Sequence, residues 1–375
     1  MQFAEVVGQR SVVDSLLRMV SSERIPHALL FLGPEGCGKL TLALALARYL
    51  LCERPSAGDC CNECSACLKT GKWIHPDLHF SIPTVGPKAT SEAFLTHWRQ
   101  ALAENPYQNV NQWLQRIGAE NKQGNITKEE CVNIVRKLSL KTVEGRYKIL
   151  IMWLPEYLGK EGNRLLKLIE EPPADTFFFL VAERQELILN TILSRCQLVH
   201  VQPLPDELVA EAVQAYRPLS AAQAQTVAYL ADGNLNEARN LVDQAESDQS
   251  DRFLDWLRKC YVGKAPALME WVESFAAVGR ENQKHLLRYG LHFLRELVLL
   301  KATGREEVRL RPAERETATR LQALVELDQL ERIINLLSDC AYHVERNAHP
   351  KVLFLDASIR IHHIFQRSGV PAGSS

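Results

Sequence analysis

The sequence lacks the marks of a membrane protein and of a strongly charged one. No apolar run approaches the ~20 residues that a helix needs to cross a bilayer. The segment 1–5 has neither the basic start nor the apolar core of a signal peptide, so we expect a cytoplasmic protein with no membrane partner. The 44 basic and 45 acidic residues give a formal charge of −1. Such a chain has no overall basic field, so any DNA contact must be local or shared with partners.

Length and apolar content indicate a globular protein of two or three domains. The chain has 375 residues, of which 46% are hydrophobic. This content is sufficient to build separate cores.

Five of the ten cysteines fall within 52–67, and four of them have the spacing of a metal site. Four thiolates so spaced can surround one Zn²⁺ ion, and an all-sulfur site leaves no position for a substrate water. We therefore predict a structural zinc site; the alternative is a set of unpaired buried thiols. Cys60 could replace Cys61, although the eight-residue gap favours the latter. The predicted ligands are Cys52, Cys61, Cys64 and Cys67.

A glycine-rich turn follows the apolar run 28–32 and precedes a helical run. This order of strand, loop and helix is typical of a phosphate-binding loop, in which backbone N–H groups surround an anion. The position that should offer a hydroxyl to Mg²⁺ holds Leu40, and the next hydroxyl, on Thr41, lies about 100° further round the helix. The candidate nucleotide-binding residues are Gly33, Gly36, Gly38, Lys39 and Thr41.

The acidic residues of an ATPase are also missing. The apolar run 148–154 predicts a buried parallel strand, whose end should carry an Asp for Mg²⁺ and a Glu that activates water. Met152 and Trp153 stand in that place. Glu156 is either a displaced acid or, as we favour, a surface glutamate at a helix start. We therefore expect no ATP hydrolysis by this chain alone, although the loop could still bind nucleotide.

The segment 81–125 has a loose pattern and is interpreted as an insertion of unknown contacts. Three of its aromatic residues, Trp98, Tyr107 and Trp113, could stack on nucleic-acid bases, but their helical spacing favours packing against the body. The preceding His75-Pro76-Asp77 is interpreted as a turn that enters a strand.

Four motifs together resemble one family. They are Gly33-x₄-Gly38-Lys39, the four-cysteine run, Leu165-Leu166-Lys167-x-x-Glu170-Glu171-Pro172-Pro173 and Thr191-Ile192-Leu193-Ser194-Arg195-Cys196. In this order they resemble the bacterial clamp-loader subunits of DNA polymerase III, over nearly the whole length and most weakly over 81–125. Within that family the incomplete phosphate loop, the missing acidic pair and the absence of a long tail resemble the delta-prime branch rather than gamma/tau.

The resemblance implies a role in DNA replication. Arg195, with Ser194 and Cys196 beside it, is expected to be an arginine finger that reaches ATP held by a neighbouring subunit. The implied partners are gamma/tau and delta in a hetero-pentamer, and the sliding clamp and primed DNA through that complex. Subunit order follows only from the resemblance. In the lid region the family often places an arginine near the nucleotide, whereas this chain has Asn236 at the matching step and Arg239 out of register.

The resemblance and the pattern of apolar residues together predict the fold class. We expect an AAA+-type α/β module with a parallel sheet and a zinc insertion over 1–202, followed by helical regions. These are a small helical lid over 203–247, an all-α collar over 252–368 and a tail over 369–375. Two other functions stay open: an active gamma/tau-like ATPase in which Thr41 and Glu156 replace the lost groups, and a structural zinc scaffold with no finger.

Overall fold

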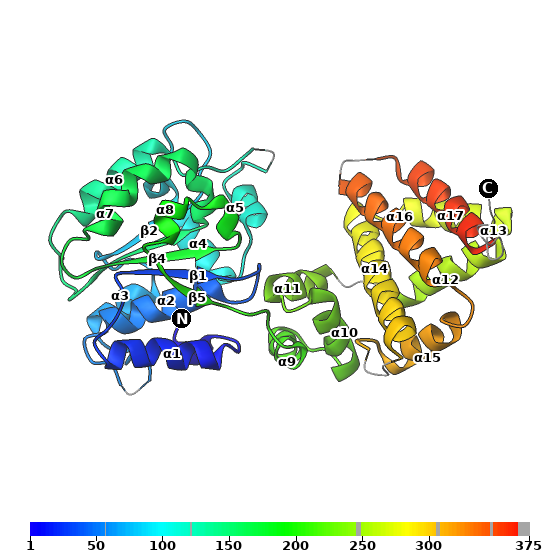
Figure 1. Cartoon of the computed structure of the whole chain (residues 1–375), viewed down its shortest axis with the longest axis horizontal. Coiled ribbons are helices and arrows are strands. Elements are labelled where there is room, and N and C mark those ends of the chain that lie inside the picture. The colour runs from blue at the N-terminus through cyan, green and yellow to red at the C-terminus, as the bar shows by residue number, and fades with distance from the viewer. Residues whose placement is uncertain (57, 121, 245–248, 305–307, 346–347, 367–375) are drawn as a thin grey trace, which may run out of the picture. The chain divides into compact units, whose positions relative to one another are not determined.

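The protein is described from a computed structural model (Figure 1). It describes residues 1–375 except 57, 121, 245–248, 305–307, 346–347 and 367–375. By packing, Met1–Ala212 with Asp232–Glu237 form one compact unit, and Val213–Ala231 with Ala238–Ser375 form the other. The three domain boundaries given above stay predictions, and the tail at 369–375 lies outside the described residues. None of the helices in the described part of the chain combines the length and the apolar character that a membrane span requires.

The first unit is built on a five-stranded sheet in the order β2-β3-β4-β1-β5. Every neighbouring pair of strands is parallel. The central strand pairs place Leu30 opposite both Leu180 and Leu198. This sheet, with helices around it and a largely helical C-terminal half, confirms the predicted fold class. The strands are β1 (Ala28–Leu32), β2 (Leu78–Ser81), β3 (Lys148–Trp153), β4 (Thr176–Ala182) and β5 (Gln197–His200).

Helices cover both faces of the sheet, which is why its inner strands are apolar except for Lys148 and Thr176, the first residues of β3 and β4. Alternate side chains of β1 enter two different cores: Leu29 and Phe31 enter one, Leu30 the other. Figure 1 shows α1 and α2 on one side of the sheet and α6 and α7 on the other. The first core also contains side chains of α1 (Arg10–Ser21), α2 (Lys39–Leu51), α4 (Leu95–Glu104) and α5 (Val110–Arg116). The second contains side chains of α6 (Lys128–Leu138), α7 (Leu166–Glu170) and α8 (Asn190–Leu193).

Short elements complete this unit and lead into the next. They are η1 (Phe3–Glu5), α3 (Ser65–Gly71), η2 (Ser91–Phe94), η3 (Pro155–Leu165), η4 (Gln185–Leu187) and α9 (Asp206–Tyr216).

Trp98, Tyr107 and Trp113, the residues of the segment 81–125 that could have stacked on bases, are core residues rather than exposed stacking platforms. Trp98 and Trp113 are fully buried, with ring centroids 5.2 Å apart. Trp98 also packs on Trp153 at 5.0 Å, so the aromatic residue that ends β3 is part of this cluster. Tyr107 is buried too, and its hydroxyl accepts a hydrogen bond from the backbone N–H of Val7 at 3.3 Å.

The second unit is helical and has its own core. Trp256 stacks on Trp271 at 5.0 Å, and Trp271 stacks on Phe275 at 4.8 Å, with Phe354 against all three rings. The long helices α14 and α16 pack against one another. The helices are α10 (Ala221–Ala231), α11 (Leu235–Gln244, of which the part from Ala238 on belongs to this unit), α12 (Gln249–Val262), α13 (Ala265–Ala276), α14 (Arg280–Thr303), α15 (Pro312–Leu321), α16 (Leu327–Glu345) and α17 (Pro350–Gln366).

Candidate functional site

The phosphate loop has the predicted shape between β1 and α2. Gly36 and Gly38 have φ values of +68° and +97°, a backbone conformation that side chains other than glycine rarely adopt. At Gly33 a Cβ atom would lie 2.1 Å from the carbonyl oxygen of Val201, so only glycine fits against β5 and its continuation. The backbone curl that the sequence predicted is therefore present.

The lysine of this loop is engaged by the chain itself. Lys39 is 5% exposed, and its Nζ donates to the carbonyl oxygen of Pro34. The same Nζ lies 3.9 Å from Oε1 of Glu183, the residue that follows β4. Burial is the main cause that raises the pKa of Glu183, while Lys39 acts in the opposite direction. The ion-pair partner of Lys39 is thus the Glu183 carboxylate, in the place that a phosphate would need to take.

Thr41 and Glu156, which could replace the missing magnesium-binding and water-activating side chains, also form hydrogen bonds within the chain. Thr41 is fully buried, and its hydroxyl donates to the carbonyl oxygen of Gly38 at 2.7 Å. Glu156 accepts backbone N–H groups of Glu183 and Arg184 at 2.5 and 2.8 Å. Glu156 is therefore half-buried and fixes the end of β4, which differs from the surface position favoured above. Its carboxylate does satisfy two donors that the strand end would otherwise leave open.

A segment distant in sequence fills the outer side of the loop. The backbone N–H of Leu235 donates to the carbonyl oxygen of Gly36 at 3.1 Å. Asn234 Nδ2 donates to Oε1 of Glu35 at 3.2 Å, and a Cβ on Gly36 would lie 1.8 Å from Asn234 Oδ1. Asn236 accepts a hydrogen bond from Asn105 Nδ2 at 2.7 Å. The segment 232–237 thus packs directly on the loop, as part of the same compact unit.

The Ser-Arg-Cys turn brings two of the quoted motifs together. Arg195 lies between α8 and β5, and its side chain is 32% exposed. Nη1 donates to the carbonyl oxygen of Thr191 at 2.6 Å and to Ser194 Oγ at 3.1 Å, and Nη2 forms an ion pair with Glu170. Burial raises the pKa of the Cys196 thiol to about 11, so this cysteine is a protonated packing residue at neutral pH.

The four predicted cysteine ligands converge on one point. In the part of the chain that the structure describes, they are the only group of three or more His, Cys, Asp or Glu residues whose ligand atoms come this close, all within 4.8 Å of one another. Cys52 Sγ lies 3.5 Å from Cys61 Sγ and 4.0 Å from Cys64 Sγ, and Cys61 Sγ lies 3.9 Å from Cys67 Sγ. A tetrahedral Zn–S distance of ~2.3 Å requires sulfur atoms about 3.8 Å apart. The group fits a metal ion.

Backbone N–H groups donate hydrogen bonds to three of these sulfur atoms, those of Cys52, Cys61 and Cys64. Cys64 N–H and Cys67 N–H each donate to the sulfur three residues earlier, at 3.4 Å. Hydrogen bonds from the N–H groups of Glu63 and Cys64 lower the pKa of Cys61 to about 6, whereas burial raises the pKa of Cys52 and of Cys67. Cys60 is buried outside the group. The buried Arg48 fixes the module by donating to the carbonyl oxygens of Cys67 and Met1, at 3.3 and 3.2 Å.

Sequence reasoning did not single out Glu183, Glu35 or Asn234. Glu183 could have been identified, because it directly follows an apolar strand at the edge where the phosphate loop lies. Asn234 gave no such signal, because it belongs to an ordinary Gly-Asn turn.

Comparison with known proteins places the chain among DNA polymerase III subunits. A family model described as "DNA polymerase III, delta subunit" matches residues 8–205. The tau subunit from Bacillus subtilis is 24% identical over 384 residues, covering 96% of this chain and 61% of that protein. The delta-prime subunit of the same organism is 26% identical over 248 residues, covering 66% of this chain and 61% of that protein. The chain thus spans about three-fifths of the length of these relatives.

The chain is also similar to a solved structure. The Bacillus subtilis DNA clamp loader delta protein aligns over 95% of this chain and 100% of its own, with 11% identity and a TM-score of 0.33.

Proposed function

Because the chain belongs to the family of the DNA polymerase III delta subunit, we propose that it is a delta-prime-type subunit of the clamp loader. This assembly places the sliding clamp on primed DNA. In this proposal the chain does not hydrolyse ATP itself; its partners are gamma/tau and delta subunits, and Arg195 serves ATP on a neighbour. The cysteine group holds structural zinc.

The internal occupation of the phosphate loop is the observation that carries the first part of the proposal. Lys39 faces Glu183 and the carbonyl oxygen of Pro34 rather than an open anion site. Glu35 and Glu156 add negative charge around the same position, since both raise the pKa of the half-buried Glu183 carboxyl. The phosphates of a nucleoside triphosphate bound in this loop would lie against carboxylates, whereas they need hydrogen-bond donors and a metal ion.

Nucleotide turnover by the purified full chain tests this part. With Mg²⁺ and ATP, we expect phosphate release no faster than that of the Lys39→Ala variant, which serves as the matched background. Steady turnover that Lys39→Ala abolishes would contradict the proposal and identify an active ATPase.

An active gamma/tau-like subunit is the competing function, because the tau relative aligns over nearly the whole of this chain. The internal bonds of Thr41 and Glu156 oppose it. Both groups would have to leave satisfied hydrogen bonds before they could act on Mg²⁺ or water.

The exposed turn at Arg195 supports the second part of the proposal. Its planar guanidinium is partly exposed; it donates to the carbonyl oxygen of Thr191 and to Ser194 Oγ within its own turn, and its one ion pair is with the partly exposed Glu170. Such a pair contributes little in water, so a γ-phosphate can replace Glu170 at small cost. A guanidinium at that phosphate neutralises charge in the transition state.

Arg195→Ala in a reconstituted loader tests the finger. We expect the rate of ATP hydrolysis at the neighbouring subunit's site to fall by roughly 10³-fold. The total DNA-stimulated rate of the loader should therefore fall by the contribution of that one site. Glu170→Gln is the matched control: it removes the same ion pair but keeps the guanidinium, and it should retain hydrolysis. An unchanged rate in Arg195→Ala would leave the structural zinc scaffold as the better function.

The second unit supports an assembly role. On α17, Val352 is 66% and Ile359 44% exposed, and they are seven positions apart, so they lie on one face of the helix. Exposed apolar side chains in register on a helix suit contact with other subunits. This fits the proposed collar.

A further inference from the structure

The first nine residues, which we call the N-terminal strap, have little secondary structure of their own. Apart from η1 (Phe3–Glu5), no residue of 1–9 belongs to a helix or strand, and the structure describes all nine. A segment at a chain end is ordered only where other parts of the chain hold it. The position of the strap therefore depends on its contacts with distant segments.

The cysteine module (52–67) holds the first half of the strap. Gln2 Nε2 donates to the carbonyl oxygen of Cys60 at 3.0 Å, and the backbone N–H of Ala4 donates to Asp59 Oδ2 at 3.0 Å. Both acceptors belong to the eight-residue loop between the first two predicted metal ligands. The strap is thus bound to the loop that a metal ion would close.

A buried arginine joins the strap to the module and to the helix that follows the phosphate loop. Arg48 belongs to α2 and is 5% exposed. Its guanidinium donates to the carbonyl oxygen of Met1 in the strap, and to Asn62 Oδ1 and the carbonyl oxygen of Cys67 in the module. Because a buried charge needs its hydrogen-bond acceptors, these three groups must stay in place together.

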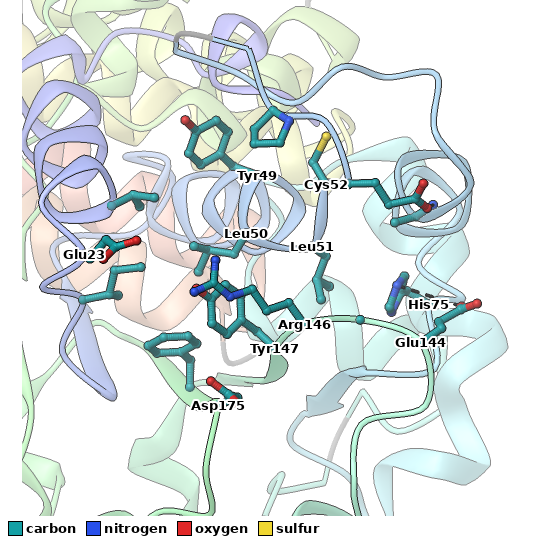
Figure 2. Close-up of a pocket in the computed structure, with 17 residues that line it drawn as sticks. Glu23, Tyr49, Leu50, Leu51, Cys52, His75, Glu144, Arg146, Tyr147 and Asp175 are labelled. Atoms are coloured by element: carbon teal, nitrogen blue, oxygen red, sulfur yellow. Dashed lines mark hydrogen bonds and ion pairs between the residues drawn. The ribbon is translucent and has the colours of Figure 1, made fainter.

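An aromatic contact adds to these hydrogen bonds. Phe3 is buried in the core on the α2 side of the sheet, with its ring centroid 5.9 Å from that of Tyr49. Tyr49 and Cys52 both line a pocket at the end of α2 (Figure 2). The end of α2, where the first predicted ligand lies, therefore also packs against the strap.

The second half of the strap contacts the phosphate loop and the segment that leads to α9. Gln9 Nε2 donates to the carbonyl oxygen of Cys37 in the loop at 3.0 Å and to that of Gln202 at 2.7 Å. A Cβ on Gly8 would lie 3.0 Å from Cδ1 of Leu208 in α9. One amide group of the strap thus holds together two segments that are far apart in the sequence.

The metal decides whether the first of these two anchors persists. The described residues of the loop 53–60 form no helix, and their one strand-like pairing is the bridge between Ser56 and Asp59. Such a loop keeps its shape only while the thiolates at its two ends are held together. Loss of the metal would therefore release both acceptors of the strap.

We propose, on the basis of the zinc site in the proposed function, that the metal-loaded cysteine module anchors the N-terminal strap. With the metal bound, the strap is fixed at the module and at the phosphate loop. Without the metal, residues 1–6 detach, and Gln9 keeps only its own hydrogen bonds to Cys37 and Gln202. The metal site thereby controls the order of a segment that contacts the phosphate loop.

Hydrogen–deuterium exchange of the purified full chain, measured by mass spectrometry, tests this proposal. Metal analysis first verifies the loaded protein, and a chelator under reducing conditions then strips the ion. On stripping, we expect exchange at residues 4–7 to accelerate on the order of tenfold, and exchange at residues 202–204 to accelerate about threefold. The amides of β4 should stay protected over the same minutes of labelling, because the sheet remains folded.

Gln2→Ala is the sharper variant, because it removes a strap side chain and leaves every residue of the module in place. It should retain the metal and accelerate exchange at residues 4–7 about fivefold in the loaded protein. In the stripped protein it should have no further effect, because the hydrogen bond to Cys60 is already lost. An equal acceleration with and without metal would mean that Gln2 acts within the strap alone, and would overturn the proposal.

Asp59→Ala removes the other acceptor and should also accelerate exchange at residues 4–7 in the loaded protein. Glu63→Ala is its matched control: it removes another carboxylate of the same module, one that forms no hydrogen bond to the strap in the described structure, and it should leave exchange unchanged. Equal exchange in the two variants would contradict the contact between Asp59 and the strap.

The remaining outcomes separate this proposal from the zinc site on which it depends. Absence of metal from the purified chain would contradict the proposed zinc, and the anchor with it. A loaded chain whose strap exchanges at the same rate before and after stripping would overturn the anchor alone, as would simultaneous loss of protection in the strap and in β4. Unchanged exchange at residues 202–204 would exclude any effect of the metal on the contacts of Gln9.

Discussion

The cysteine group and the phosphate loop are two ligand sites predicted from spacing, and the structure treats them in opposite ways. Four sulfur atoms lie within 4.8 Å of one another around a common point. At the phosphate loop the backbone has the predicted curl, but Lys39, Thr41 and Glu156 all bind other groups of the chain. A motif therefore fixes the shape of a loop, whereas the rest of the fold decides whether its functional groups stay available.

The largest expected effect belongs to the cysteine group. Cys64→Ser removes one thiolate but keeps an oxygen that can cap α3, where the sulfur now accepts the Cys67 N–H. We expect zinc to fall from about one equivalent to less than half, and the free energy of unfolding to fall by on the order of 3 kcal/mol. Metal analysis and thermal unfolding measure the two changes.

Cys60→Ser is the matched control, because Cys60 is a buried cysteine of the same segment that lies outside the group. It should retain the metal. Equal metal loss in the two variants would mean that the ligand set is assigned wrongly.

A smaller effect tests whether Asn234 fills the phosphate loop. Gly36→Ala should cost about 2 kcal/mol of stability, because a Cβ there both strains the backbone and meets Asn234. Gly118→Ala is the matched control. The φ of Gly118, +69°, equals that of Gly36 within a degree, but a Cβ at Gly118 would meet no atom beyond its chain neighbours within 4 Å. It should cost about 1 kcal/mol. Denaturant unfolding measures both costs.

The same experiment in an Asn234→Ala background sharpens this comparison. Removal of the Asn234 side chain should bring the cost of Gly36→Ala close to that of Gly118→Ala. If the two glycine substitutions cost the same in the original background, Asn234 does not occupy the loop.

The smallest effect concerns Glu183 and depends on pH. Its pKa is raised in the folded protein, chiefly by burial, so the folded state holds the proton more tightly and stability falls as pH rises above the unfolded value of about 4.5. Glu183→Gln removes this loss and should stabilise the protein by about 1 kcal/mol at pH 7 and by nothing at pH 3. Unfolding at the two pH values measures the difference; equal effects at both would exclude titration of Glu183 as the cause.

Much of the first unit could be predicted from local sequence. The strands β1, β3 and β4 follow from apolar runs, since a parallel strand covered on both faces has few polar positions. The aromatic residues of 81–125 were predicted to pack, and Trp98 and Trp113 are fully buried. The cysteine group could be predicted because its four ligands lie within sixteen residues, 52–67, whose turns fix their distances.

The contacts that close the phosphate loop could not be predicted in this way. Asn234 and Glu35 are 199 residues apart in the sequence, and Glu183 reaches Lys39 only because β4 pairs with β1. The sequence by itself determined which groups each loop offers, because the chemistry and local geometry of a short motif depend on its own residues. The tertiary structure decided which groups remain free, because their competing partners come from distant segments that only the completed fold brings within hydrogen-bond distance.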